Sequence, residues 1–117
     1  MNSEMFNKGL SKRRKVLGDE YVDKALATAD EFGADLQKLI TEYAWGEVWN
    51  KEALSDKERS MINLGMISAL NRPHELELHI KGALNNGLTK EQIKDIFLQV
   101  TVSVSYTHLR AHETREY

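Results

Sequence analysis

The sequence contains no cysteine and only one proline among its 117 residues. The absence of cysteine excludes disulfide frameworks, thiolate metal sites, cysteine nucleophiles and CxxC redox chemistry. No apolar run approaches the roughly 18 residues that a membrane-spanning helix needs, so we expect no contact with a membrane. In residues 1–15 the basic side chains follow the apolar ones, which is the wrong order for a secretory signal, and we expect a cytoplasmic protein.

An excess of charge of either sign is also absent, because the formal net charge is -2. The one basic cluster is the run from Lys12 to Lys15. It is either a solvated helix face or a nucleic-acid contact, and the lack of interleaved aromatic residues favours the solvated face. We therefore expect no nucleic-acid partner.

The length and the pattern of apolar residues predict one all-α domain of five to six helices. Expected helices cover about residues 4–17, 20–31, 34–44, 56–70 and 73–86. Another amphipathic helix is expected after Thr89, with Ile93, Ile96, Phe97 and Val100 on its apolar stripe. The second is expected to end near Gly33, and an irregular aromatic turn is expected over Trp45–Trp49. The capping boxes Ser55–Glu58 and Thr89–Gln92 mark two of the helix starts.

The segment Met61–Leu70 is apolar on nearly every face. A soluble protein buries such a helix on all sides or in a subunit interface, so we expect it to be central. The next helix carries His79 within its apolar stripe, three residues after Leu76 and four before Ala83. The imidazole is then either an ordinary core residue or an acid–base catalyst, and Glu75 one turn earlier either orients it or is a surface ion partner.

Three further groups of residues carry possible chemistry. Trp45 and Trp49 flank Glu47. Either the two rings are ordinary hydrophobic packing and Glu47 is solvated, or the rings form an apolar wall that holds Glu47 as a catalytic carboxylate. Arg59 and Arg72 lie near the two ends of the apolar helix. They are either ordinary surface residues or bind a substrate carboxylate through two hydrogen bonds each. A metal site is disfavoured, because the five-residue spacing of His74 and His79 splays their side chains apart.

Three segments carry a resemblance to a known family: RRKVLGDEYVDKAL, TEYAWGEVWN, and the long run from KERSMINLGM to KDIFLQV, which includes NRPHELELHIKGALNNG. They resemble the carboxymuconolactone decarboxylase family over Met1 to about Val102. In the related alkylhydroperoxidase-D branch a CxxC motif precedes the histidine, whereas the cysteine positions here hold Arg72 and Glu75 while His79 remains. Without thiols the chain cannot carry out that peroxidase chemistry.

The resemblance implies an alkylhydroperoxidase-D-like helical fold and decarboxylation of 4-carboxymuconolactone to the 4-oxoadipate enol-lactone in protocatechuate catabolism, without cofactor or metal. Within that chemistry His79 and Glu47 are the expected catalytic pair. Arg59, Arg72, Trp45 and Trp49 are expected to bind the substrate. The resemblance also implies a homo-oligomer, a hexamer in the full-length protein. A catalytically silent helical oligomer or a small-ligand binding protein on the same scaffold is the alternative.

The end of the sequence departs from the family, which continues with a turn and a final helix. Residues 104–114 instead match the translation of a transposase sequencing adaptor in one reading frame. We therefore expect a family domain at residues 1–102, without its final helix, and a foreign tail at residues 103–117. His108 and His112 have a metal-friendly spacing, but on this interpretation they are not ligands.

Overall fold

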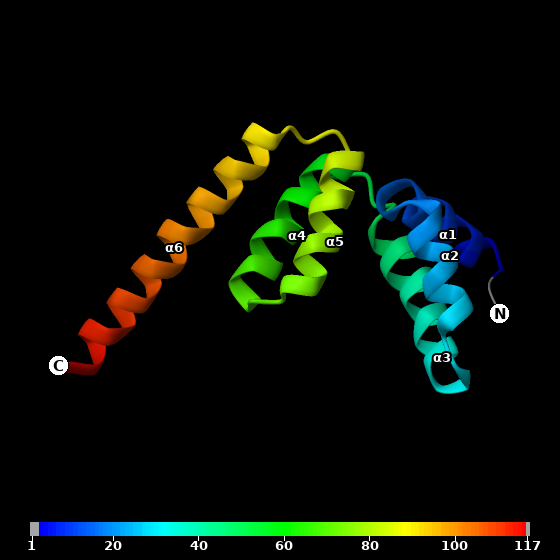
Figure 1. Ribbon diagram of the computed structural model, residues 1–117, viewed down its shortest axis with the longest axis horizontal. Helices are drawn as coiled ribbons and strands as arrows, with labels where there is room; N and C mark the ends of the chain where they lie inside the picture. Colours follow the sequence, from blue (N-terminus) through cyan, green and yellow to red (C-terminus); the bar gives the residue numbers. More distant parts are fainter. Residues whose placement is uncertain (1–2, 117) are drawn as a thin grey trace. The chain divides into compact units, whose positions relative to one another are not determined.

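The computed structural model describes the backbone of residues 3–116 and the side chains of residues 4–105. Every regular element in this part of the chain is a helix, which confirms the all-α prediction (Figure 1). The elements are α1 (Ser3–Leu17), α2 (Asp19–Thr28), α3 (Glu31–Leu39), the π-helix η1 (Ile40–Val48), α4 (Asp56–Leu70), α5 (Pro73–Asn85) and α6 (Lys90–Glu116).

Contacts between residues group these helices into two units. Unit 1 covers residues 1–59 and unit 2 covers residues 60–117, so the first turn of α4 belongs to unit 1 and the rest to unit 2. Each unit is described by itself below. Among the described residues, no helix combines the length and the apolar character that crossing a bilayer requires.

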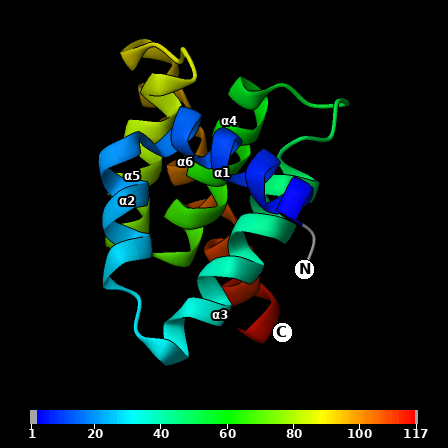
Figure 2. The same ribbon diagram turned by 90° about the vertical axis from the view of Figure 1, so that its right-hand side faces the viewer.

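In unit 1, α1 packs against η1, the segment that continues α3 (Figure 2). Two glycines lie at this crossing. A methyl group on Gly9 would overlap the main-chain carbonyl of Thr41, and one on Gly46 would lie 2.7 Å from the carbonyl oxygen of Met5. The absence of side chains at these positions allows the two backbones to approach closely. Fully buried Val16 and Val22 add the apolar contacts that α1 and α2 contribute to this unit.

The aromatic segment is helical, which corrects the expected turn at Trp45–Trp49. Residues 40–48 form a π-helix, and the amide of Trp49 donates to the carbonyl of Ala44 at 2.9 Å, five residues back. Asn50 then caps the end, because its Nδ2 donates to the carbonyls of Trp45 and Gly46 at 3.0 and 3.1 Å. π-Helical segments are rare and are frequent at functional sites.

The boundary after α2 also differs from the prediction. Helix α2 ends at Thr28, and Gly33 lies inside α3 rather than at the end of the helix before it. The start of α3 is fixed by Asp30, whose carboxylate accepts a hydrogen bond from the amide of Gly33 at 2.7 Å. This is an N-cap that lacks the glutamate or glutamine of a capping box.

The capping box at the start of α4 is confirmed, because Ser55 and Glu58 bond each other's amides at 2.8 and 3.1 Å. Asp56 in its first turn joins α4 to α1, since its carboxylate accepts hydrogen bonds from Lys12 at 2.9 Å and from Lys15 at 3.1 Å. This arrangement ties the first turn of α4 to unit 1.

The basic run on α1 is only partly the solvated face that we expected. Lys15 is exposed, but Arg13 is only 4% exposed. The guanidinium of Arg13 donates to the hydroxyl of Thr41 at 3.3 Å, and that hydroxyl donates to the carbonyl of Gln37. Burial lowers the pKa of Arg13, and the nearby Tyr21 opposes this effect.

Unit 2 is built on the helix pair α4 and α5, which side-chain hydrogen bonds join at Asn63 and at Ser60 of α4. Its core consists of Leu64, Ala83, Leu88 and Ile93, with Met61, Leu76, Ile80, Ile96 and Phe97 packed against it. Pro73 opens α5 as predicted. Helix α5 ends at Asn85, and Gly87 follows in the turn with a φ of 94°, which is unfavourable for residues with a side chain.

Within unit 2, helix α4 is not buried on all sides. Leu64 is fully buried, but Ile62, Met66 and Leu70 are 45%, 52% and 70% exposed. Unit 2 alone therefore does not meet the first of the two expectations for this apolar helix, burial on all sides. The other, a subunit interface, stays a prediction.

The capping box of α6 is confirmed by bonds between Thr89 and Gln92 at 2.9 and 3.0 Å. The helix continues to Glu116, through the predicted domain boundary after Val102. Val102 itself is 68% exposed. The side chains of residues 106–117, including His108 and His112, lie outside the described part, so the foreign nature of residues 103–117 stays a proposal.

Candidate functional site

His79 lies on α5 at the contact with α4, half-buried next to the core of unit 2. Its Nδ1 lies 3.4 Å from the side-chain amide nitrogen of Asn63 on α4. The predicted placement of His79 on the apolar stripe is thus consistent with its position. A second polar contact joins the same helices where Asn86 Nδ2 donates to the hydroxyl of Ser60 at 2.8 Å.

The environment of His79 favours its neutral form. Burial lowers the pKa of the imidazole below its ordinary value of 6.5, and the negative charge of Glu75, one turn earlier on α5, opposes this shift. A neutral imidazole has one nitrogen that donates and one that accepts, which suits it to proton transfer near neutral pH. Glu75 is exposed and acts on His79 through its charge.

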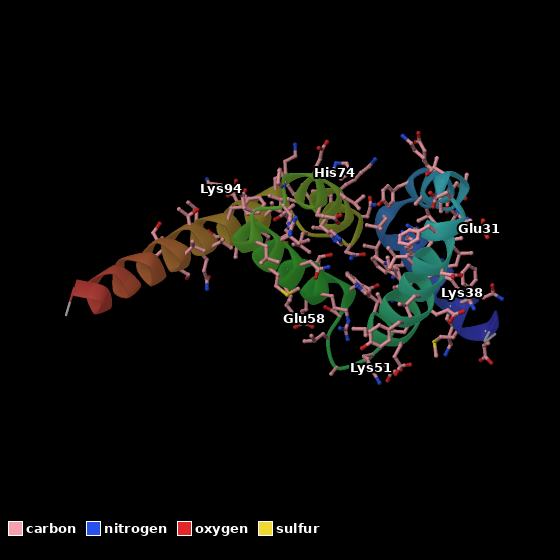
Figure 3. The ribbon with its side chains drawn as sticks, turned by 90° about the horizontal axis from the view of Figure 1, so that it is seen from below. Glu31, Lys38, Lys51, Glu58, His74 and Lys94 are labelled. Atoms are coloured by element: carbon pink, nitrogen blue, oxygen red, sulfur yellow. The ribbon has the colours of Figure 1, made fainter. Side chains whose placement is uncertain are left out.

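Arg72 precedes α5 at the N-cap position and is exposed. Its side chain makes no capping bond to the helix. His74, labelled in Figure 3, is also exposed at the start of the same helix. Arg72 and His79 therefore belong to one helix of unit 2, with the cation at its beginning and the imidazole near its middle.

The two tryptophans form a stacked pair in unit 1. The ring centroids of Trp45 and Trp49 lie 4.7 Å apart at an interplanar angle of 23°, and the residues are 5% and 8% exposed. Glu47 lies between them in sequence but is exposed, and it forms an ion pair with Lys51 at 3.1 Å. Of the two alternatives for this segment, the local geometry is that of packed aromatics beside a solvated carboxylate.

Arg59 is held near the same ion pair through the main chain. Its guanidinium donates to the carbonyl of Lys51 at 3.0 Å, and its Nε is buried without a hydrogen-bond partner. Lys51 thus contacts Glu47 with its side chain and Arg59 with its backbone. The structure brings together Glu47, Lys51 and Arg59 in unit 1, and separately His79 and Asn63 in unit 2.

The predicted pairing of Glu47 with His79 joins residues of the two different units, and it stays a prediction. The same holds for a shared site of His79 with Arg59 or with the tryptophans. Within unit 2 alone, His79 has Asn63 as its hydrogen-bond partner and Glu75 as its charged neighbour.

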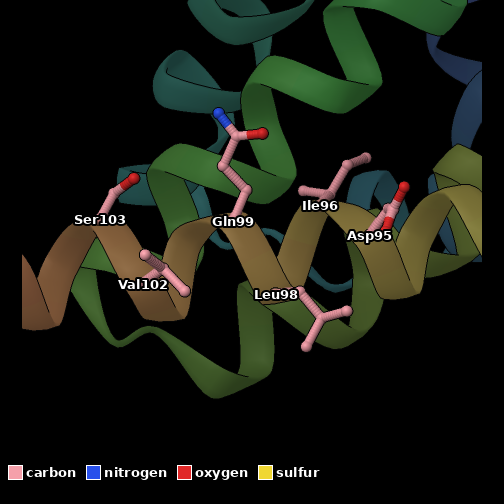
Figure 4. A pocket seen from close by; sticks show the side chains of 6 residues that line it. All are labelled: Asp95, Ile96, Leu98, Gln99, Val102 and Ser103. Carbon is pink, nitrogen blue, oxygen red and sulfur yellow. The ribbon is translucent and has the colours of Figure 1, made fainter.

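A shallow hollow on α6 contains none of the predicted site residues (Figure 4). All its lining residues come from this one helix: Asp95, Ile96, Leu98, Gln99, Val102 and Ser103. It is therefore an open helix face rather than an enclosed pocket. Among the described residues, no cluster of three or more histidine and acidic side chains has the geometry to hold a metal ion.

The sequence alone does not predict the contacts of two residues, Asn63 in unit 2 and Arg13 in unit 1. The partner of Asn63 lies on the next helix, although a polar amide inside an apolar helix is a usable signal. Arg13 stands among other basic residues, which favours a solvated face. Its burial follows from the close crossing of α1 and η1, which its own neighbours in the sequence do not reveal.

Comparison with known proteins places the chain in a family. The sequence model of the carboxymuconolactone decarboxylase family matches residues 34–111, a range that includes His79, Asn63, Arg59 and Arg72. The chain belongs to the carboxymuconolactone decarboxylase family. It is accordingly a decarboxylase. The matched range also extends beyond Val102, into the segment that we predict to be foreign.

Curated relatives in this family include proteins from a fungus and from bacteria. The nitrosuccinic acid decarboxylase of Metarhizium robertsii is 42% identical over 87% of this chain and 71% of its own length. The 4-carboxymuconolactone decarboxylase of Acinetobacter baylyi is 36% identical over 87% of this chain and 77% of its own length. A 4-carboxymuconolactone decarboxylase of Pseudomonas putida is 36% identical over 38% of this chain and 92% of its own length.

Proposed function

We propose that this decarboxylase converts 4-carboxymuconolactone to the 4-oxoadipate enol-lactone in protocatechuate catabolism, without a cofactor. The observation that carries the proposal is the similarity to the Acinetobacter baylyi enzyme along most of both chains. It is supported by the half-buried imidazole of His79, whose environment favours the neutral form that can donate a hydrogen bond to developing negative charge.

The chemistry of the substrate explains why side chains alone are sufficient. The departing carboxylate is attached to a ring carbon that is conjugated through a C=C bond to the lactone carbonyl. When the C–C bond breaks, CO₂ leaves and the electron pair moves into the ring as a dienolate with its negative charge on the carbonyl oxygen. A proton is then added at the ring carbon next to that carbonyl. The net reaction consumes one proton from solvent and releases one CO₂.

We assign both proton-related tasks to His79. As a neutral imidazole it donates a hydrogen bond to the carbonyl oxygen, where negative charge develops in the transition state. That charge favours uptake of a solvent proton by the ring, which then delivers it to the carbon. We propose Glu47 as the carboxylate that assists this transfer, although in unit 1 it is paired with Lys51.

The substrate carries two carboxylates, so the proposed site also needs cations and an apolar wall. Arg59 and Arg72 are the proposed cations, because a guanidinium binds a carboxylate through two parallel hydrogen bonds. The buried Nε of Arg59, which lacks a partner, leaves that guanidinium with unused hydrogen-bonding capacity. The Trp45–Trp49 pair is the proposed apolar wall that keeps water from the leaving carboxylate.

Nitrosuccinate is a second candidate substrate, favoured by the 42% identity to the Metarhizium robertsii enzyme. Its decarboxylation also leaves an electron pair on carbon that has to be delocalised and then protonated. Loss of CO₂ from the carbon that bears the nitro group moves the electron pair onto the nitro oxygens, and a proton is then added to that carbon. This substrate is also a dianion with its own electron sink, so the same imidazole and arginines would serve it.

The test is a direct comparison of the two acids with the purified protein. Ultraviolet absorbance and CO₂ release are followed with 4-carboxymuconolactone and with nitrosuccinate at equal concentrations. We expect the larger kcat/KM for the lactone. A larger kcat/KM for nitrosuccinate would reassign the substrate. No turnover of either acid above the uncatalysed rate would favour the binding-protein alternative.

A further inference from the structure

The side chain of Asn63 occupies an unusual place for an amide. It lies on α4 directly before Leu64, which is fully buried, and it faces the imidazole of His79 from across the helix pair. A half-buried amide in apolar surroundings is unfavourable unless its polar atoms find partners. The 3.4 Å contact between Asn63 Nδ2 and His79 Nδ1 supplies such a partner.

The chemistry of this contact determines which nitrogen of His79 carries the proton. An amide nitrogen only donates hydrogen bonds, so the nitrogen that faces it has to accept. If Nδ1 accepts, the single proton of the neutral imidazole resides on Nε2. An imidazolium would instead place an N–H group on Nδ1, so uptake of a proton by the ring during the reaction requires the amide of Asn63 to turn its carbonyl oxygen toward Nδ1. The contact therefore favours the neutral ring as well as one of its two tautomers.

We propose that Asn63 is a positioning residue for His79, which fixes the imidazole as the Nε2–H tautomer and so makes Nε2–H the group offered to the substrate. This inference rests on the proposed function, in which His79 donates to the developing oxyanion. A fixed tautomer keeps the N–H donor on Nε2 before the substrate binds. The proton therefore does not have to move between the two ring nitrogens during the reaction, which would raise the activation free energy. Asn63 itself need not touch the substrate.

The chain offers two informative substitutions and a matched control. Asn63→Ala removes the amide and leaves Nδ1 without its donor. Asn63→Asp has nearly the same shape, but its carboxylate accepts a hydrogen bond and therefore favours the Nδ1–H tautomer and the charged ring. Ser60→Ala is the control, because it removes the other polar contact between α4 and α5, the 2.8 Å bond from Asn86, without touching His79.

The measurement is long-range ¹H–¹⁵N correlation of the imidazole rings, with His79 assigned by comparison with His79→Gln. Above the pKa of His79 we expect the Nε2–H tautomer in the wild-type protein and in Ser60→Ala. We expect a mixture in Asn63→Ala, and the Nδ1–H tautomer with a raised pKa in Asn63→Asp. kcat should fall on the order of 10-fold to 100-fold in Asn63→Ala, a range typical for loss of a histidine's orienting partner, with KM little changed.

Two outcomes would overturn the inference, and they are distinguishable. If the wild-type ring is the Nδ1–H tautomer, or if Asn63→Ala changes neither tautomer nor kcat while His79→Gln is inactive, the positioning role is wrong and the proposed function stands. If the tautomer follows Asn63 but His79→Gln retains wild-type turnover, the catalytic role of His79 is wrong, and the positioning role for catalysis is overturned with it.

Discussion

Gly9 on α1 lies so close to Thr41 on η1 that any side chain at Gly9 would overlap the main-chain carbonyl of Thr41. The same two helices meet again where Gly46 faces the carbonyl of Met5. Thr41 also accepts the hydrogen bond from the buried Arg13. This crossing therefore holds both the π-helix that carries the tryptophans and the buried cation of unit 1.

We predict that Gly9→Ala destabilises the protein, because the obstacle is main chain and cannot rotate away. Overpacking of this kind costs typically about 1–3 kcal/mol, and occasionally more. Gly65→Ala is the matched control, since a methyl group at Gly65 on α4 meets no atom within 4 Å and alanine favours a helix. Urea unfolding followed by circular dichroism measures both. A Gly9→Ala protein as stable as the Gly65→Ala protein would contradict the close crossing.

The parts of the fold that the sequence predicts well are those fixed by local chemistry. Ser55 with Glu58 and Thr89 with Gln92 satisfy each other's amides within one turn, so their residue types alone locate two helix starts. The π-helix was not predictable in this way. It packs against α1 where Gly9 meets Thr41, and these two residues are far apart in the sequence and meet only in the folded chain.

In the candidate site, too, local features follow from the sequence, whereas contacts between helices do not. The half-buried position of His79 follows from the helical spacing of its apolar neighbours, so the sequence predicts it. Its partner Asn63 lies on another helix, α4. The spacing of residues in one helix contains no information on such contacts between helices.

We predict that Glu75→Gln lowers the pKa of His79 further, because it removes the negative charge that opposes the effect of burial. Glu77→Gln on the same helix should leave the pKa unchanged, since Glu77 is exposed and does not act on His79. Titration of the His79 ring by NMR measures both. Equal pKa values in Glu75→Gln and the wild-type protein would contradict the assignment.

The lowered pKa of His79 in the wild-type protein also makes its stability depend on pH. The folded state binds the His79 proton less tightly than the unfolded state, so the free energy of unfolding falls as the pH drops through 6.5 and stops falling below the folded-state pKa. His79→Gln should remove this component. If the pH dependence of stability between pH 8 and pH 5 were the same in both proteins, the lowered pKa would be wrong.

We predict that removal of residues 103–117 changes the stability of the protein little. Val102 is 68% exposed, and we propose that the segment after it is foreign. The midpoint of thermal unfolding should change by less than about 5 °C, which corresponds to about 1 kcal/mol in a domain of this size. Removal of the chain after Thr89 is the control, because it deletes Ile93 from the core of unit 2.

The same truncation tests the part of the family match that continues to residue 111. If the protein without residues 103–117 failed to fold, or melted more than about 10 °C lower, the segment would belong to the packed fold. The proposal that it is foreign would then be wrong.

We predict a homo-oligomer, because apolar side chains remain exposed in both units, and the family resemblance implies a hexamer in the full-length protein. In unit 1 Phe32 is 91% and Leu39 59% exposed, and in unit 2 Leu70 is 70% exposed. Large exposed apolar surfaces are typical of interaction sites. Multi-angle light scattering at micromolar concentration measures the mass. Phe32→Glu should shift it downward and Glu31→Gln should not, whereas a stable wild-type monomer would contradict the prediction.

The most direct test of the catalytic account is the turnover of 4-carboxymuconolactone by His79→Gln and by Glu47→Gln. Glutamine at position 79 retains approximate volume and hydrogen-bonding capacity but cannot transfer a proton, a contribution of typically 10² to 10⁴ in rate. We predict that His79→Gln keeps its helical circular dichroism and loses kcat by a factor in this range. A folded His79→Gln protein with near wild-type decarboxylation would contradict the account and leave Glu47 as the better candidate.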